Sequence, residues 1–187
     1  GRDAFATLAV TSPSLRVTPN GPVVAWNADD RLVVKRWDGA AWVNLGTDDG
    51  PVNSGGFVPS LTLAPDGSVY VAWAESAAGF GLQSIKAAHG TLAGWTSLGG
   101  AINPPEFADF ADSQRMQLTV GADGAPLVAY ASFDFGVGVE VRRWDGTAWN
   151  LLGARQANAP TNRVMHLSVD VARTGTQVTL SWPNTIA

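Results

Sequence analysis

The chain has 187 residues, a formal net charge of −4 and a pI near 5.0, and only two of its twelve basic residues are Lys. Nucleic-acid binding needs a basic stripe, so we expect no nucleic-acid partner. Cys is absent, which removes thiolate nucleophiles, Cys-ligated metals and disulfides. No apolar stretch approaches the length of a membrane span and no signal-peptide pattern opens the chain, so we expect no membrane insertion.

The chain repeats a pattern whose period is typical of propellers and solenoids. Pro13-Ser14-Leu15, followed by Asn20-Gly21, returns as Pro59-Ser60-Leu61, followed by Asp66-Gly67. A third copy runs from Leu118 to Tyr130, and a weaker fourth copy follows. The corresponding turn glycines are Gly21, Gly67, Gly124 and Gly175, which are 46, 57 and 51 residues apart.

Each repeat predicts four short strands in two hairpins. The first strand alternates apolar residues and ends at Asn-Gly or Asp-Gly, the strongest short hairpin signal. The second strand, such as 69–73, is almost continuously apolar, as expected of a strand buried on both faces. The third and fourth strands turn at Asp38-Gly39 in the first repeat and at Asp145-Gly146 in the third.

Four antiparallel strands in each repeat predict an all-β protein made of β-propeller blades. We expect four-stranded antiparallel meanders, about four blades in all, with the last one incomplete. The chain is then a single propeller domain or propeller segment over residues 1–187. Its repeats cover approximately 13–58, 59–114, 115–163 and 164–187, and residues 1–12 serve as a closing strand.

The repeat pattern P-S-L-x-[VL]-x-x-[ND]-G, V-A-W and W-D-G-x-x-W-x-x-L-G resembles the blades of bacterial extracellular β-propeller repeat proteins. More distantly, the D-G-x-x-W turn resembles the Asp-box hairpins of sialidase-like propellers and of lectin-like propellers. Asp and Gly are adjacent here, and no Ser or Thr stands two residues before the Asp. The resemblance implies a secreted or cell-surface bacterial protein with structural turns.

No catalytic set is recognised in the sequence, and we expect no enzymatic activity. Glycoside hydrolysis needs two carboxyl groups beside the scissile bond, and the only Glu residues are Glu75, Glu106 and Glu140. The recurring Asp residues are explained as turn residues. His89 and His166 are predicted on opposite faces, so no shared metal site is expected.

The tryptophans recur at fixed positions, which is what packing between blades produces. Trp26, Trp73, Tyr130 and Trp182 end the second strand of each repeat. Trp42, Trp95 and Trp149 each stand three residues before a Leu-Gly pair, and we expect all three to be buried structural residues.

The two faces of the predicted propeller differ. One carries the near-uniform tight turns, and the other carries the long connections 47–58, 74–82, 100–114, 132–138 and 154–163. Function usually resides on variable loops held by a rigid scaffold. The predicted contacts with a ligand or partner are carboxylates and non-repeated aromatics of those loops: Asp48, Asp49, Glu106, Phe107, Asp109, Phe110, Asp112, Phe133, Asp134 and Phe135.

These loops could bind a sugar or a protein, or their phenylalanines could fold back onto the blades. No cofactor is expected, although their carboxylates could hold Ca²⁺. The sequence favours a non-catalytic extracellular recognition or scaffold module that binds a protein or glycan surface. A second copy of the chain is a further possible partner, through self-association of the terminal strands. The alternatives are a carbohydrate-binding lectin and, less favoured, a sialidase-like glycoside hydrolase.

Overall fold

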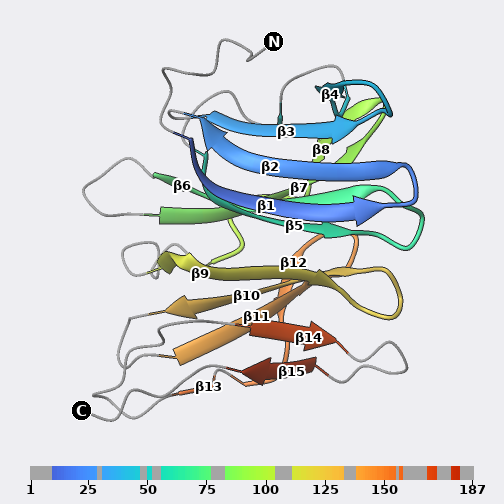
Figure 1. The fold of residues 1–187 in the computed structure, drawn as a ribbon. Coiled ribbons are helices and arrows are strands. Elements are labelled where there is room, and N and C mark those ends of the chain that lie inside the picture. Colours follow the sequence, from blue (N-terminus) through green and yellow to red (C-terminus); the bar gives the residue numbers. More distant parts are fainter. Residues whose placement is uncertain are drawn as a thin grey trace.

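The computed structural model describes residues 10–28, 31–46, 50–51, 56–76, 83–103, 111–132, 138–154, 156–157, 168–171 and 178–181. Within these ranges every regular element is a β-strand, and no helix long and apolar enough to cross a membrane occurs. The strands form successive antiparallel sheets that lie one above another along the molecule (Figure 1). This confirms the predicted all-β blades.

Three sheets are four-stranded meanders whose strands pair in chain order. Blade 1 contains β1 (Val10–Thr18), β2 (Gly21–Ala28), β3 (Arg31–Trp37) and β4 (Trp42–Asn44). Blade 2 contains β5 (Gly56–Leu63), β6 (Val69–Ser76), β7 (Gln83–Thr91) and β8 (Gly94–Ser97). Blade 3 contains β9 (Ala111–Val120), β10 (Pro126–Ser132), β11 (Gly138–Trp144) and β12 (Trp149–Leu151), with β13 (Gln156–Ala157) pairing β11.

The fourth repeat contributes a two-stranded sheet. Its strands are β14 (Ser168–Val171) and β15 (Val178–Ser181), and β14 contacts β9 of blade 3. This two-stranded sheet follows blade 3 in the row of sheets (Figure 1).

The first strands of neighbouring blades lie beside one another, since β5 contacts both β1 and β9. A repeated side-chain hydrogen bond joins them. The Leu61 N–H donates to Ser14 Oγ at 3.1 Å, and the Leu118 N–H donates to Ser60 Oγ at 2.9 Å. The Ser of the Pro-Ser-Leu motif thus accepts a hydrogen bond from a backbone N–H in the first strand of the next blade.

The first strand of each blade begins earlier than predicted. β1, β5 and β9 start at Val10, Gly56 and Ala111, and each pairs with its neighbour through a register shift that marks a β-bulge. In β5 the bulge includes Val58, whose φ is 46°. A bulge adds unpaired residues and therefore interrupts the alternation by which sequence patterns reveal strands.

The predicted closing strand over residues 1–12 needs a correction at its end. Val10 and Thr11 pair with Ala28 and Asn27 of β2, so they extend blade 1 itself. Residues 1–9 lie outside the described residues, and their closing role stays a prediction.

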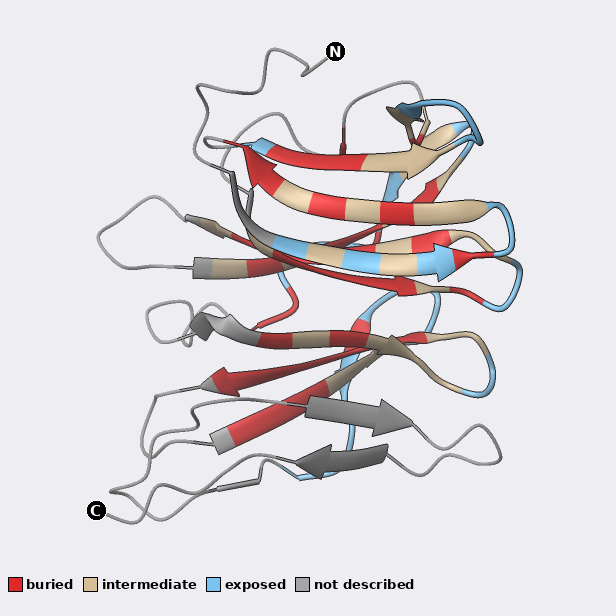
Figure 2. Ribbon diagram, in the orientation of Figure 1, coloured by how far each residue is buried: buried red, intermediate tan, exposed pale blue. Residues whose placement is uncertain are grey.

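The core consists of two clusters of buried side chains, each formed between two sheets. The cluster between blades 1 and 2 contains Val23, Ala25, Val34, Leu61 and Trp73 among others. The cluster between blades 2 and 3 contains Ile85, Leu98, Leu118, Tyr130 and Trp149. In Figure 2 the buried residues, in red, lie mainly in the strands, whereas the described turns between the strands are largely exposed.

The expectation that Trp42, Trp95 and Trp149 are all buried is wrong for one of them. Trp149 is 9% exposed and Trp95 is half-buried, but Trp42 is 46% exposed. Trp149 packs against the blade that precedes its own, and its Nε1 donates to Leu98 O at 2.7 Å. No described sheet precedes blade 1, so the same position is left uncovered at Trp42.

Candidate functional site: a cleft between blades 1 and 2

Most of the predicted contact residues lie outside the described residues: Asp48, Asp49, Glu106, Phe107, Asp109, Phe110, Phe133, Asp134 and Phe135. Their role stays a prediction. Asp112, which was predicted in a loop, lies instead in β9 opposite Ala131. The start of the 100–114 connection also belongs to the core, because Ile102 and Asn103 are buried and both bond the backbone of Ile85.

A cleft of about 560 Å³ opens between blades 1 and 2 on the face that carries the tight turns. Its walls are the two turns of blade 1, at Asn20 and Asp38, and the two turns of blade 2, at Asp66 and Leu92. The ligand site was expected on the opposite face, which carries the long connections, and the Asp residues of these turns were explained as turn residues. The walls nevertheless combine a guanidinium, two carboxylates, hydroxyl groups and aliphatic side chains.

Blade 2 lacks an indole at a position where blades 1 and 3 carry one. Trp37 and Trp144 end their third strands opposite Trp42 and Trp149, and Gly90 takes the same place opposite Trp95. Trp144 packs against the cluster between blades 2 and 3. Gly90 lines the cleft, and the Trp95 ring lies so close to it that an added Cβ would come within 2.4 Å of the ring.

Arg36 is the basic group of the cleft. It lies on β3 opposite Val23, and its buried Nε has no hydrogen-bond partner. The matching residue of blade 3 is Arg143, opposite Leu127, and Arg143 forms an ion pair with Asp123 of the turn beside it. Blade 1 has Asn20 at that turn position. Blade 1 therefore lacks, at Asn20, the carboxylate that would pair with Arg36 as Asp123 pairs with Arg143.

Two carboxylates stand at the turns on either side of the cleft. The backbone N–H groups of Ala41 and Ala40 donate to Asp38 Oδ1 at 2.8 and 2.9 Å and lower the pKa of Asp38. The Ser68 hydroxyl and backbone N–H donate to Asp66 Oδ1 at 2.5 and 2.9 Å and lower the pKa of Asp66. Both groups are therefore ionised acceptors at neutral pH, held in place by their turns.

Aliphatic groups complete the cleft. Val23 and Leu45 are buried at its base and belong to the cluster between the two blades. Leu92 is 71% exposed at the blade 2 turn. The cleft thus offers apolar surface together with one positively charged and two negatively charged hydrogen-bonding groups. Such a combination of apolar and polar groups is usual for a small-ligand site.

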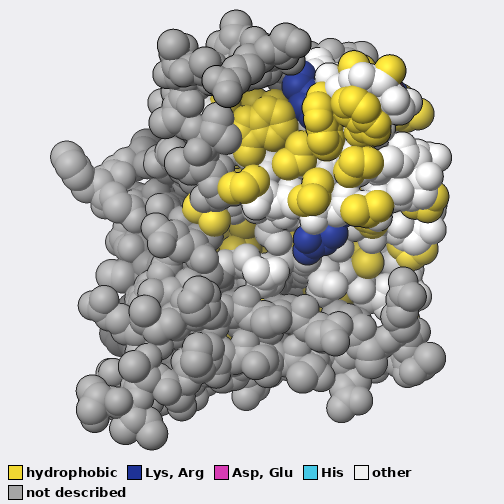
Figure 3. Space-filling view, viewed as in Figure 1, with side chains coloured by type: hydrophobic (Ala, Val, Ile, Leu, Met, Phe, Trp, Pro, Cys, Tyr) yellow, Lys and Arg dark blue, Asp and Glu magenta, His cyan; other side chains and the backbone are white. Residues whose placement is uncertain are grey.

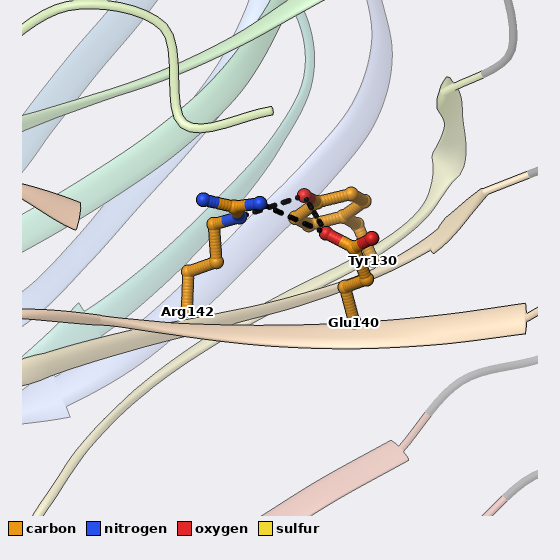
Figure 4. A network of polar contacts seen from close by, with 3 residues as sticks. All are labelled: Tyr130, Glu140 and Arg142. Atoms are coloured by element: carbon orange, nitrogen blue, oxygen red, sulfur yellow. Dashed lines mark hydrogen bonds and ion pairs between the residues drawn. The ribbon is translucent and has the colours of Figure 1, made fainter. Parts of the chain in front are cut away.

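The corresponding interface between blades 2 and 3 holds a buried polar network (Figure 4). The Tyr130 hydroxyl donates to Glu140 Oε2 at 2.6 Å, and Arg142 bonds both groups, with Nε 3.1 Å from the hydroxyl and a terminal nitrogen 3.2 Å from the carboxylate. Tyr130 has no exposed surface. Burial, followed by the hydrogen bond to Glu140, raises the pKa of Tyr130 well above its ordinary value.

The remaining candidate groups also have structural partners. Glu75 accepts a hydrogen bond from Trp73 Nε1 at 2.9 Å. His89 stacks on Tyr70 and bonds Ser68 Oγ at 2.7 Å, while His166 lies outside the described residues. Among the residues whose placement is described, no cluster of three or more His, Asp or Glu side chains is arranged to hold a metal ion.

No protein-family model and no curated protein matches the chain, whereas several solved structures do. A protein of unknown function from Dyadobacter fermentans superposes with a TM-score of 0.67 at 18% identity, over 95% of this chain and 63% of that one. The chain has a β-propeller fold. It spans about three fifths of the length of the Dyadobacter protein.

Two further matches have known ligands or activities. The GH43 endo-arabinanase from Bacillus licheniformis superposes with a TM-score of 0.52 at 13% identity, over 93% of this chain and 71% of the enzyme. The Aleuria aurantia lectin in complex with Fucα1-6GlcNAc superposes with a TM-score of 0.52 at 16% identity, over 94% of this chain and 55% of the lectin. At these identities the likeness concerns the fold.

The cleft lies outside the sites expected from the sequence, although two signals of it are present there. Both appear when the repeats are aligned position by position. Gly90 replaces an otherwise recurrent Trp, and Asn20 replaces the Asp of the later turns. Departures from the repeat at strand ends, and not only at long loops, mark this site.

Proposed function

We propose that this chain is a non-catalytic recognition module that binds a sugar residue in the cleft between blades 1 and 2. The observation that carries the proposal is the arrangement of Arg36, with its buried Nε unpartnered, between the ionised turn carboxylates of Asp38 and Asp66. Arg36 forms no ion pair like that of Arg143 with Asp123 in blade 3, and its charge is one of the lesser causes that lower the pKa of Asp38.

The chemistry of the cleft matches that of a saccharide. Guanidinium N–H groups donate to hydroxyl or ring oxygens, and the two carboxylates accept from sugar hydroxyls as charge-assisted hydrogen bonds. The aliphatic surface of Leu45 and Leu92 suits the C–H face of a pyranose. The volume of about 560 Å³ lies within the range of small-ligand pockets and would hold one or two sugar units.

The non-catalytic part of the proposal is supported by the partners of the described carboxylates. Glu75 bonds an indole, and Glu140 is buried against Tyr130 and Arg142. An arginine, a tyrosine and a glutamate are the groups that a sialidase-like site would use, but here the hydroxyl has no exposed surface. A tyrosine whose pKa is raised is also a poorer nucleophile, since less of it is ionised.

The proposal extends to location, with the module acting outside the cell or at its surface on a glycan. The solved structures that share the fold include a lectin bound to a fucosylated disaccharide, which is in keeping with this function. They also include an endo-arabinanase, and glycoside hydrolysis is therefore the alternative that needs a direct test.

Glycan-array screening followed by calorimetric titration tests the binding proposal. Asp66→Asn should weaken binding of the selected sugar at least tenfold, because it removes a charged acceptor while its amide oxygen still accepts from Ser68. Asp123→Asn is the matched control, because Asp123 occupies the same turn position in blade 3 and is paired with Arg143. Equal effects of the two substitutions, or no binding to any sugar, would reject the proposal.

Hydrolysis is tested separately with chromogenic glycosides, arabinosides among them. We expect no release of the chromophore by the purified chain. Release that is lost in Glu75→Gln or Glu140→Gln, with the fold retained by circular dichroism, would establish an enzyme in place of a binding module.

A further inference from the structure

A second hollow, with a volume of about 330 Å³, lies between the first strands of blades 1, 2 and 3. It is a groove at the level of the Pro-Ser-Leu motif, and all three strands contribute the same two motif positions to it. The lining residues are Pro13, Ser14, Leu15 and Arg16 of β1, Val58, Pro59 and Ser60 of β5, and Met116 and Gln117 of β9. None of them lines the cleft between blades 1 and 2, so the groove is a separate candidate site.

Arg16 is the only charged residue in the lining of this groove. It pairs with Val23 of β2, which belongs to the cluster between blades 1 and 2, so its side chain lies on the side of β1 that faces blade 2. In the part of the chain that the structure describes, its side chain bonds only Leu15 O, at 2.8 Å, and forms no ion pair. The guanidinium therefore keeps its positive charge and several N–H donors available to a ligand.

Arg16 is also a departure from the repeat. The residues that follow the Leu of the motif in blades 2 and 3 are Thr62 and Thr119, and neither carries a charge. Two blades form with Thr at this position, so the blade fold itself does not require an arginine there. Gln117 is a second departure in the same groove, because it stands where the other two blades have the Ser of the motif.

Two hydroxyl groups add hydrogen-bond donors to the groove. Ser14 Oγ accepts the Leu61 N–H, and Ser60 Oγ accepts the Leu118 N–H. Within the described ranges neither hydroxyl donates a hydrogen bond of its own. A hydroxyl that accepts a hydrogen bond is polarised and becomes a better donor. The groove thus combines a guanidinium with two hydroxyl donors, and its lining contains no carboxylate.

The backbone and the surroundings of the groove also favour a ligand site. Val58 lies in the β-bulge of β5 with a φ of 46°, a conformation that a β-branched residue rarely adopts. Strained residues of this kind are concentrated at binding sites. Figure 3, in the orientation of Figure 1, shows Lys or Arg side chains over the region of β1 and β5, and no Asp or Glu of a described residue is in view. This environment favours an anion.

We propose that the groove binds the carboxylate of a small organic acid and that Arg16 pairs with it. The planar guanidinium matches the two oxygens of a carboxylate. One guanidinium balances the single charge of a carboxylate, whereas a doubly charged phosphate or sulfate would leave negative charge unbalanced. The volume of about 330 Å³ suits a small molecule. Two sources share this chemistry, a uronic acid sugar and an aliphatic acid, and the test separates them.

The test is a set of titrations followed in proton–nitrogen NMR spectra, with glucuronate, with succinate, and with glucose as the neutral counterpart of glucuronate. The amide resonances of Leu61 and Leu118 report on the groove, because their N–H groups bond its two Ser hydroxyls. We expect both acids to shift these resonances to saturation and glucose to leave them unchanged. A response to one acid alone would narrow the ligand to that source. No response to either acid, or an equal response to glucose, would overturn the proposal.

Arg16→Thr gives blade 1 the residue of blades 2 and 3, so the fold should persist. It should weaken acid binding about tenfold or more, because it removes the charged donor. The matched control is Arg31→Thr, which removes the same charge at the exposed start of β3, outside the lining of the groove. This control should bind the acids as the unmodified protein does. Retained binding by Arg16→Thr, or equal weakening in both variants, would overturn the proposal.

The same spectra distinguish the groove from the cleft. A ligand in the cleft should shift the amide resonances of Ser68 and Gly90, which line it. An acid that shifts only these two resonances would lie in the cleft, which would overturn the present proposal and leave the proposed function standing. Conversely, loss of sugar binding in the cleft would not affect the response of Leu61 and Leu118 to an acid.

Discussion

The two interfaces between the blades have the same backbone plan and different side-chain chemistry. Between blades 2 and 3, Trp149 donates to Leu98 O, Trp144 packs on the core, and Tyr130 is bonded to Glu140 and Arg142. Between blades 1 and 2, Gly90 and Arg36 line a cleft, and the buried Nε of Arg36 has no hydrogen-bond partner. One interface is closed and internally satisfied, and the other keeps an opening with polar groups around it.

The comparison indicates that a few side-chain changes in a repeated scaffold can alter binding at one interface without altering the contacts that stabilise the fold. Backbone pairing and the Ser-mediated links are common to both interfaces. The lining of the cleft differs from the repeat in having Gly at a Trp position and Asn at an Asp position. We therefore expect substitutions in the closed interface to lower stability, and substitutions in the cleft to change binding while the fold persists.

The largest expected effect is that of Trp149→Ala. It removes a buried indole and its hydrogen bond, and should lower the free energy of unfolding by roughly 3–5 kcal/mol. Trp42→Ala, at the same position in blade 1, should cost much less, because Trp42 is 46% exposed. Urea denaturation at low protein concentration compares the two, and equal losses would contradict the difference in their packing.

The next effect is that of Tyr130→Phe. The ring remains, but Glu140 and Arg142 each lose a buried hydrogen-bond partner, which should cost about 1–3 kcal/mol. Tyr70→Phe is a suitable control, because Tyr70 is only partly buried and stacks on His89. A melting temperature that falls equally in both variants would mean that the network adds nothing to the closed interface.

A smaller effect is expected from Ser60→Ala. The Leu118 N–H loses its acceptor at a buried site, which should cost about 1 kcal/mol. Ser14→Ala removes the equivalent link between blades 1 and 2 at a partly buried site and should cost less. Thermal unfolding of the two variants would show whether the Pro-Ser-Leu motif is the inter-blade link that the distances indicate.

The smallest effect concerns pH and sugar binding. Because the pKa values of Asp38 and Asp66 are lowered from the ordinary 3.8, both carboxylates stay ionised as the pH falls, and their contribution is lost only below that value. Sugar affinity should therefore change little between about pH 7 and about pH 5. A titration series that shows a steep loss in this interval would assign the acceptor role to other groups.

The strands and turns were predictable because their signals are local. Asp-Gly turns and apolar second strands specify hairpins within a few residues, and the structure places them where the repeats predicted. The β-bulges were not predictable in the same way. The strands begin at Val10, Gly56 and Ala111, and a bulge separates each start from the rest of its strand. The bulge interrupts the apolar alternation from which a strand is recognised in the sequence.

Exposure and the cleft were harder to predict, because they depend on neighbours in space. Trp42 and Trp149 have the same local sequence, and only the presence of a preceding blade buries the second. The turn face looked uniform because its backbone turns are alike. Arg36 and Arg143 also have similar local sequences. The residue that distinguishes their surroundings, Asn20 or Asp123, lies in the turn between the first and second strands of the same blade.

The measurement that tests the account most directly is calorimetric titration of the selected sugar into Arg36→Ala and Arg143→Ala. The two arginines occupy equivalent blade positions, one in the cleft and one paired with Asp123 in blade 3. The account predicts that Arg36→Ala abolishes measurable binding with little change in melting temperature, while Arg143→Ala binds as the unmodified protein does. Retained binding by Arg36→Ala, or equal loss in both variants, would contradict it.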